Sequence, residues 1–177
     1  KSQTLSDGKR YYTLPDGTNL PSVTTVLGAM KKDAIMAWRK RVGDEVANAI
    51  SKKATSRGTN VHTLCERYLN NDSLGDIMPD AKEMFNDIKP LLDQIDNIHY
   101  QEQALWSTKL GLAGRVDCIG EFDGKLSVID FKTSKEPKPR HWIDHYFIQA
   151  MFYGMAYYEM TGTQIKKLVI IMACENG

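Results

Sequence analysis

The sequence is poor in cysteine, and the cysteines that it has are far apart. Cys65, Cys118 and Cys174 show no C-x-x-C spacing, which excludes a zinc ribbon and a disulfide framework. Cys65 lies in a helical pattern and Cys118 in a strand pattern, positions typical of small core residues. We therefore expect free thiols in a reducing, intracellular compartment.

Long apolar runs and an excess of one charge are also absent. No apolar run approaches the roughly 20 residues that a membrane span requires, so we expect no membrane association. A net charge of +1 over 177 residues excludes an indiscriminate basic coat for nucleic acid, while still allowing local basic patches. The sequence shows neither a signal peptide nor an Arg/Ser-rich transit segment. Because it starts at Lys1 instead of methionine, we expect further residues at both ends.

No tract rich in proline, glycine or serine divides the chain, and its 177 residues suffice for one substantial core. We therefore predict a single domain over residues 1–177. Within this domain we expect residues 1–58 to form an N-terminal hairpin and helices, and residues 59–177 to form the core.

Apolar periodicity and turn residues predict the order of the elements. The N-terminal part should contain a hairpin over residues 11–20 that turns at Pro15-Asp16-Gly17, a short helix capped by Ser22, and helices over 33–42 and 44–58. The core should contain helices over 60–69 and 81–95, a strand over 98–106, a hairpin over 114–132, a buried helix over 141–160 and a central strand over 167–173. Asp80 is the predicted N-cap of the helix over 81–95, which Pro90 should kink or end early. The last strand should run parallel to one of its neighbours.

The hairpin over residues 114–132 carries the clearest chemical signal. Asp123-Gly124 supplies the positive φ angles of a two-residue type I′ turn, which sets the register of the two strands. In that register Asp117 lies opposite Asp130, and Lys132 shares their face. Two carboxylates so placed repel each other, and a divalent cation between them would offset the repulsion while Lys132 supports a hydroxide or a developing phosphate charge. The alternative is a solvated hairpin end in which Lys132 or Arg115 neutralises the aspartates.

Two helical pairs are further candidates. His62 and Glu66 stand at i and i+4 on one helix face, and Gln149 and Tyr153 do so in the most apolar helix. The alternatives are a structural histidine and a packed aromatic helix with one satisfied amide. Basic residues form clusters, each of which is equally explained as a solvated helix face: Lys31-Lys32, Arg39-Lys40-Arg41, Lys52-Lys53 with Arg57, and Lys135, Lys138 and Arg140.

Four patterns occur in a recognisable order. They are R-G-T-N-V-H at residues 57–62, G-R-V-D at 114–117, D-F-K at 130–132 and Q-A-M-F-Y at 149–153. This arrangement resembles the RecB-like branch of the PD-(D/E)xK nuclease superfamily. Within that branch the chain looks most like the mitochondrial genome maintenance exonucleases and their phage and bacterial relatives, and the resemblance covers nearly the whole chain.

The resemblance implies an α/β fold of the restriction-endonuclease type, with a mixed central sheet flanked by helices and preceded by an N-terminal hairpin and helical extension. It implies a metal-dependent DNA exonuclease that acts on single-stranded DNA or flaps in replication, repair or recombination. We expect the protein to be a monomer. We expect it in a bacterial or phage-infected cytoplasm in preference to a mitochondrial matrix. A double-strand exonuclease, a structure-specific endonuclease and a non-catalytic DNA-binding recombination module remain alternatives.

The resemblance also assigns roles to residues. The metal ligands would be His62, Asp117, Asp130 and the main-chain carbonyl of Phe131, while Glu66 and Glu102 are further acids outside the matched motifs. Lys132 would be the catalytic lysine, and Gln149 and Tyr153 would either orient Lys132 or bind the scissile phosphate, which Arg115 would also contact. Oxygen-rich ligation favours Mg²⁺, and the one imidazole suits Mn²⁺ as a substitute. The scattered cysteines exclude the iron–sulphur cluster of the CRISPR-associated relatives. The expected DNA contacts are Arg39, Lys52, Lys53, Arg57, Arg115 and Lys135, with Trp38 available for base stacking.

Overall fold

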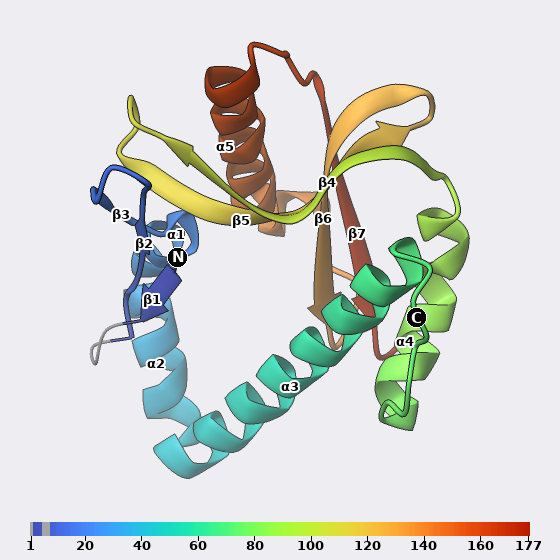
Figure 1. Cartoon of the computed structure of the whole chain (residues 1–177). Helices are drawn as coiled ribbons and strands as arrows, with labels where there is room; N and C mark the ends of the chain where they lie inside the picture. The colour runs from blue at the N-terminus through green and yellow to red at the C-terminus, as the bar shows by residue number, and fades with distance from the viewer. Residues whose placement is uncertain (1, 5–7) are drawn as a thin grey trace.

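The computed structural model describes residues 2–4 and 8–177, and Figure 1 shows the arrangement of its elements. The N-terminal part consists of β1 (Ser2–Thr4), β2 (Arg10–Thr13), β3 (Asn19–Pro21), α1 (Val23–Ala29), α2 (Lys32–Val42) and α3 (Asp44–Leu69). The remainder consists of α4 (Pro79–Leu92), β4 (Ile95–Ser107), β5 (Leu112–Phe122), β6 (Lys125–Ser134), the 3₁₀ turn η1 (Arg140–Trp142), α5 (Asp144–Thr161) and β7 (Lys167–Cys174).

The main sheet has the strand order β4-β5-β6-β7. The first three strands are antiparallel neighbours and β7 runs parallel to β6, which confirms the predicted mixed α/β sheet. The prediction that residues 167–173 form a central strand is wrong, because β7 pairs with β6 alone among the described strands. Helix α5 carries the chain across one face of the sheet and returns it at the outer side of β6, and this crossover places β7 at the edge.

The hairpin of β5 and β6 has the predicted turn and register. Asp123 and Gly124 have φ angles of 52° and 69°, the positive values of a type I′ turn. Pairing runs from Phe122 opposite Lys125 to Cys118 opposite Ile129, and the next position along the two strands is that of Asp117 and Asp130.

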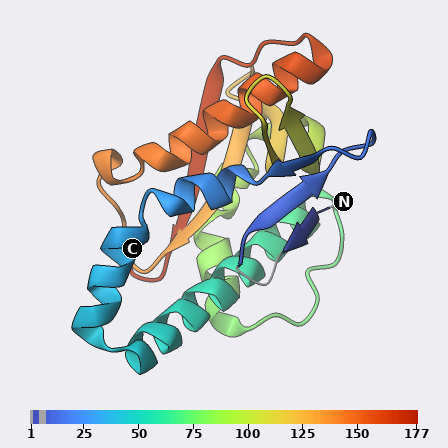
Figure 2. The same ribbon diagram turned by 90° about the vertical axis from the view of Figure 1, so that its left-hand side faces the viewer.

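Two hydrophobic clusters cover the two faces of the sheet. On one face α3 and α4 pack Val61, Leu64 and Phe85 against Ile129 and Phe131. On the other face α5 and α1 pack on the sheet, and α1 lies alongside α5 (Figure 2). The sheet is therefore the middle layer of an α/β/α arrangement, as expected for strands with apolar residues on both faces.

Helix α3 corrects one prediction, since residues 44–69 form a single helix where two were expected. Glycine within a helix costs only about 1 kcal/mol relative to alanine, so Gly58 does not interrupt the helix. The half that follows Gly58 buries Val61, Leu64 and Cys65, and this burial offsets that cost.

The ends of two other helices also differ from the prediction. Helix α4 begins at Pro79 with Met78 as its N-cap residue instead of Asp80, because proline suits the first helical position. Pro90 lies in the last turn and the helix ends at Leu92, so residue 95 belongs to β4. The helix predicted from residue 141 begins at Asp144, since η1 precedes it.

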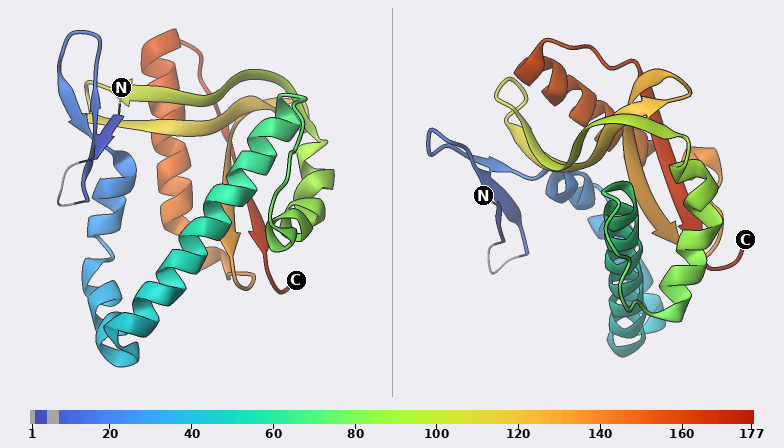
Figure 3. Two further views of the ribbon diagram at one scale, coloured as in Figure 1. Left: turned by 60° about the horizontal axis from the view of Figure 1, so that its bottom comes forward. Right: turned by 45° about the vertical axis from the view of Figure 1, so that its right-hand side comes forward.

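The N-terminal part contains the predicted hairpin, formed by β2 and β3, and the predicted cap, since the Ser22 side chain accepts from the Thr24 N–H. Beyond α1, helix α2 buries no residue and meets α3 at a corner remote from the sheet (Figure 3). Gly43 forms this corner with a φ of 86°, which favours glycine. No helix within the described ranges is long and apolar enough to cross a membrane.

Candidate active site

Three carboxylates lie in a row across three neighbouring strands. Pairs on both sides, Gln101 with Cys118 and Gln103 with Val116, place Glu102 of β4 opposite Asp117 of β5. On the other side of Asp117 the hairpin register brings Asp130 of β6 to the same level. Glu102 has a φ of 51°, which is an unusual left-handed conformation for a residue other than glycine. Such strained backbone conformations occur most often at functional sites.

Asp117 is held by the main chain of the neighbouring strand. Its Oδ2 accepts a hydrogen bond of 2.8 Å from the Phe131 N–H, where a strand carbonyl would otherwise bind. Burial raises the pKa of Asp117 well above its ordinary value, and the charge of Asp130 raises it further. The two acids therefore repel each other, and a cation between them would offset this repulsion.

Asp130 begins a chain of polar contacts that crosses to α5. Its Oδ2 lies 2.8 Å from the Lys132 Nζ, and Lys132 donates to the Gln149 Oε1 at 2.9 Å. The Gln149 Nε2 donates in turn to the Tyr153 Oη at 3.1 Å. Burial alone would lower the pKa of Lys132, but Asp130 and then Asp117 raise it above its ordinary value, so this lysine is a fixed positive charge at neutral pH.

Helix α3 has an outer half, residues 44–57, and an inner half, residues 58–69, and His62 reaches the same site from the inner half. Its Nδ1 lies 3.5 Å from the Asp117 Oδ1, and its ring packs edge-on against the Phe131 ring. Burial lowers the pKa of His62 although Asp130 opposes this effect, so the imidazole is neutral at pH 7. A neutral imidazole is the form that binds metal ions.

The site fits a divalent metal ion. One ligand atom each of His62, Glu102 and Asp117 lie within 4.8 Å of one another. Asp130 adds a buried Oδ2 that has no aligned hydrogen bond despite its ion-pair distance from Lys132. Carboxylate oxygens with one imidazole form a ligand set suited to Mg²⁺ and Mn²⁺.

The mouth of the site is a cavity of about 420 Å³ with Gly58, Thr59, His62, Thr63, Glu66, Glu102 and Arg115 in its walls. Glu66 thus lies near the grouped ligands, although it is not one of them. The Arg115 Nε donates to the Glu102 main-chain oxygen at 3.0 Å and lies 2.9 Å from its Oε2. Burial raises the pKa of Glu102, and Arg115 opposes this shift. Arg115 is exposed on its outer side and can meet an anion that enters the mouth.

The other predicted DNA contacts lie outside this mouth. Arg57 donates to the Glu175 Oε1 at 2.8 Å, and the Lys53 Nζ lies 3.7 Å from the same oxygen. Arg39 donates to Asp44 and Asn48 at the corner of α2 and α3. Lys52 and Lys135 are exposed, and Trp38 is half-buried. Since Arg57 and Arg39 have partners within the protein, Lys52 and Lys135 are more accessible to a ligand than either arginine.

Two elements of the site have no motif in the sequence that marks them. The Phe131 N–H that holds Asp117 has no sequence signal, because any residue carries a main-chain N–H. Tyr146 lies beneath the Lys132 ammonium, 5.0 Å from ring centre to Nζ. In the sequence, the indication that Tyr146 lies near Lys132 is its position one turn before Gln149 on the same helix.

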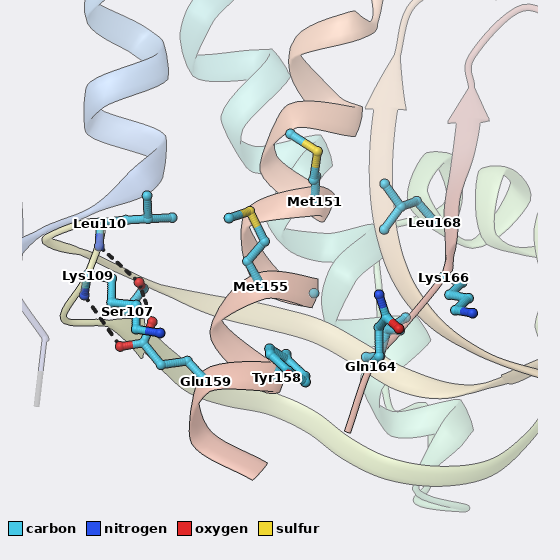
Figure 4. Close-up of a pocket in the computed structure, with 12 residues that line it drawn as sticks. Ser107, Lys109, Leu110, Met151, Met155, Tyr158, Glu159, Gln164, Lys166 and Leu168 are labelled. Carbon is cyan, nitrogen blue, oxygen red and sulfur yellow. Dashed lines mark hydrogen bonds between the residues drawn. The ribbon is translucent and has the colours of Figure 1, made fainter. Parts of the chain in front are cut away.

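A larger cavity, of about 530 Å³, lies elsewhere and shares no residue with the carboxylate site (Figure 4). Met151, Met155 and Tyr158 of α5 line it, on the face of the helix opposite Gln149 and Tyr153. Glu159 closes one end by accepting hydrogen bonds from the turn between β4 and β5, including one of 2.6 Å from Ser107. These hydrogen bonds join α5 to the turn, and they, first that of Ser107, lower the pKa of Glu159.

Comparison with known proteins agrees with this geometry. Residues 91–173 match the family model of the PD-(D/E)XK nuclease superfamily. The human mitochondrial genome maintenance exonuclease 1 is 30% identical over 147 residues, which are 75% of this chain and 40% of that protein. The mouse protein of the same name is 30% identical over 132 residues, covering 68% of this chain and 39% of that protein. The Xenopus tropicalis protein is 31% identical over 93 residues, or 51% of this chain and 27% of that protein. The chain thus spans less than half the length of these relatives.

Proposed function

We propose that the protein is a metal-dependent DNA exonuclease that hydrolyses phosphodiester bonds, and the match of residues 91–173 to the PD-(D/E)XK nuclease superfamily model supports this proposal. The observation that carries the proposal is the geometry around Lys132, whose ammonium lies 2.8 Å from Asp130 while Asp117 is held on the adjacent strand. The matched exonucleases support the reaction class, because their similarity includes the segments that supply these residues.

The metal ligands in this proposal are His62, Asp117, Asp130, Glu102 and the main-chain carbonyl of Phe131. A bound Mg²⁺ or Mn²⁺ would activate water at neutral pH and shield the charge that develops on the phosphate. Glu66 lies at the mouth, where it can hold a water molecule that reaches the ligand group.

Lys132 has a separate task from the carboxylates. Its positive charge lies in a half-buried position and is oriented in advance by Gln149, which Tyr153 orients in turn. A charge fixed before the reaction stabilises a developing phosphorane oxygen without the cost of reorganising solvent. Arg115 at the mouth can bind a phosphate of the incoming strand.

The proposed substrate is single-stranded DNA or a flap end. Beyond the site, α2 and the outer half of α3 expose both basic and apolar side chains, including Lys52, Ile35 and Ile50. Phosphates and unstacked bases of a single strand match such a mixed surface, whereas the base faces of a duplex are stacked on one another and are not accessible to apolar side chains. Trp38 is the aromatic side chain available on α2.

We further propose a monomer that works in DNA replication, repair or recombination, with residues 1–177 as one domain. The three cysteines are free and buried, which suits a reducing compartment. We propose a bacterial or phage-infected cytoplasm as its location, although the matched relatives are named as mitochondrial proteins.

End-labelled single-stranded, duplex and flapped DNA, each incubated with Mg²⁺, Mn²⁺ or EDTA, will test the proposal. We expect products that shorten from an end, that form fastest on single strands or flaps, and that are absent in EDTA. Lys132→Ala should abolish them, and Lys125→Ala at the exposed hairpin turn is the matched control. DNA binding without cleavage in any metal would support the non-catalytic alternative instead.

A further inference from the structure

Beside the proposed active site lies a group of basic side chains that has no assigned role. Lys31 follows α1, Lys138 lies in the loop after β6, and His145 and Tyr146 stand in the first turn of α5. The Lys31 Nζ lies 2.7 Å from the His145 Nε2, and Lys138 donates to the Tyr146 Oη at 3.3 Å. The rings of His145 and Tyr146 are 4.1 Å apart. We name Lys31, Lys138 and His145 the lysine–histidine cluster.

Tyr146 connects this cluster to the proposed catalytic lysine. The Lys132 Nζ lies 5.0 Å from the centre of the Tyr146 ring, and the Lys138 Nζ lies 5.6 Å from it. The ammonium groups of Lys132 in β6 and of Lys138 in the following loop therefore both contact the Tyr146 ring. A phosphate bound by the cluster would be a close neighbour of the phosphate that Lys132 contacts.

The cluster carries positive charge on its two exposed lysines. Among the described side chains, no carboxylate lies within ion-pair distance of Lys31 or Lys138. The nearest acid on α5, Asp144, is bound by Arg140. Unbalanced charges that converge on one point are costly in the free protein, and a bound anion would remove that cost.

The pKa of His145 also reflects the positive charge around it. Its pKa is lowered first by burial and then by Lys31, Lys138 and Lys132, while Asp144 opposes the shift. The pKa of Lys31 is lowered by burial and by Lys138. His145 is therefore neutral at pH 7 and accepts the hydrogen bond from Lys31, which leaves the remaining N–H groups of the Lys31 ammonium for a ligand.

We propose that the lysine–histidine cluster is a second phosphate site, which binds a strand phosphate next to the one that is cleaved. This deepens the proposed function, on which it rests. Lys31 and Lys138 supply the charge, and His145 holds Lys31 in position. The chemistry is the same for an internal phosphodiester and for a phosphate at the strand end, so the experiment must separate these two sources.

The contact of Lys31 with His145 has a simpler explanation, namely that it docks the N-terminal part on α5. Lys138 distinguishes the two explanations, because among the described residues its hydrogen bond and its cation–π contact are with Tyr146 of α5, and it acts on Lys31 by charge repulsion. It is exposed and lies in a loop, so its removal should not alter folding.

The experiment measures binding of a ten-nucleotide oligothymidylate in EDTA, where no cleavage occurs, as a function of salt. The oligonucleotide is prepared with hydroxyl groups at both ends, with a 5′-phosphate, or with a 3′-phosphate. Lys138→Ala and Lys31→Ala/Lys138→Ala are compared with wild type and with Lys82→Ala/Lys125→Ala, a control that removes the same charge from exposed positions elsewhere. Thermal unfolding of each variant verifies that it folds.

We expect the slope of log affinity against log salt to fall by about 0.7 for Lys138→Ala and by about 1.4 for the double variant. An equal loss for all three oligonucleotides identifies an internal phosphodiester, and a loss confined to one phosphorylated end identifies a terminal phosphate. A double variant that binds like its charge-matched control overturns the second site.

Cleavage separates this proposal from the proposed function. If wild type cleaves DNA in Mg²⁺ while the variants bind normally, the proposed function stands without the second site. If wild type shows Lys138-dependent binding but no cleavage, the exonuclease proposal fails alone.

Discussion

The two halves of α3 belong to one continuous helix but have opposite environments. In the inner half, from Gly58 to Leu69, Val61, Leu64 and Cys65 are at most 1% exposed. In the outer half, from Asp44 to Arg57, Ala47 is the one buried residue, and Val46 and Ile50 are each 50% exposed. The inner half fixes His62 beside Asp117, whereas the outer half extends away from the sheet and meets α2 (Figure 3).

This difference separates two tasks along one element. A metal ligand must be held to within a few tenths of an ångström, which requires a packed backbone on both sides of it. A surface that grips a flexible strand needs accessible charge and apolar area instead. We therefore expect changes in the inner half and its neighbours to affect catalysis and stability, and changes in the outer half to affect DNA affinity.

The largest effect should come from the polar chain beside the inner half. Lys132→Ala should lower the cleavage rate by on the order of 10²–10³-fold or more, because it removes a preorganised charge from the transition state. Asp130→Ala should be equally damaging through weaker metal binding, which Lys132→Ala should spare. Cleavage assays together with calorimetric titration of Mn²⁺ separate the two losses. Wild-type rates in Lys132→Ala would remove the lysine from the mechanism.

The second prediction compares the two halves directly through protein stability. Leu64→Ala in the inner half should lower the free energy of unfolding by about 2–5 kcal/mol, because it leaves a cavity in the packed core. Ile50→Ala in the outer half should change it by less than about 0.5–1 kcal/mol, since Ile50 is 50% exposed. Urea denaturation measures both values. Equal losses would mean that the outer half is packed in solution.

The third prediction concerns pH in EDTA. Burial and Asp130 raise the pKa of Asp117 in the folded state, so its contribution to stability is fully present below the unfolded pKa of about 4 and is lost as pH rises through the folded pKa. Asp117→Asn should remove this loss and make the metal-free protein less sensitive to pH on the alkaline side of pH 4. Unfolding temperatures between pH 4 and pH 8 provide the measurement.

Glu175, which pairs with Arg57 of the outer half, should have a contribution to stability that depends on pH in the opposite direction to that of Asp117. Hydrogen bonding to Arg57 lowers the pKa of Glu175, so its contribution is present above the unfolded pKa and is lost as pH falls through the folded one. Glu175→Gln should therefore lower the unfolding temperature near neutral pH and leave it unchanged in acid.

Metal binding provides a further comparison. Mg²⁺ should raise the unfolding temperature of wild type but not that of Asp117→Asn, because a ligand stabilises only the state that binds it.

The smallest effect should come from the outer half. Lys52→Ala/Lys53→Ala should leave the cleavage rate at saturating DNA unchanged and lower the slope of log affinity against log salt by about 0.7 for each phosphate that the protein no longer binds. Lys52 should contribute more than Lys53, which lies 3.7 Å from the Glu175 Oε1. Filter binding of a single strand across a salt series tests this, with Lys82→Ala as the control. A fall in the saturated rate would place the outer half in the catalytic machinery.

Glycine at position 114 shows how closely the site is packed around these residues. A Cβ built there would lie 2.8 Å from a ring carbon of Tyr153 and 3.0 Å from its Oη. Gly114 thus allows β5 to approach the helix that orients Lys132 through Gln149 and Tyr153. The G-R-V-D pattern contains this glycine, but the pattern alone does not reveal which side chain needs the space.

Local chemistry determined the part of the site that the sequence predicted. The Asp123-Gly124 turn sets the pairing of β5 with β6 by its own backbone angles, and so brings Asp117, Asp130 and Lys132 together without help from distant residues. Helical spacing likewise paired Gln149 with Tyr153. These are contacts over one hairpin or one helical turn, where a pattern in the sequence has one geometric outcome.

Only the tertiary structure decided the remaining contacts. Whether Gly58 ends a helix depends on how much the following residues bury against the sheet, and the place of β7 at the edge depends on the path of α5. Glu102 meets Asp117 through the pairing of β4 with β5 and an unusual backbone angle, and Lys31 meets His145 across 114 residues of chain. Such contacts result from packing over the whole domain, because local preferences of about 1 kcal/mol are small beside the free energy of burying a core.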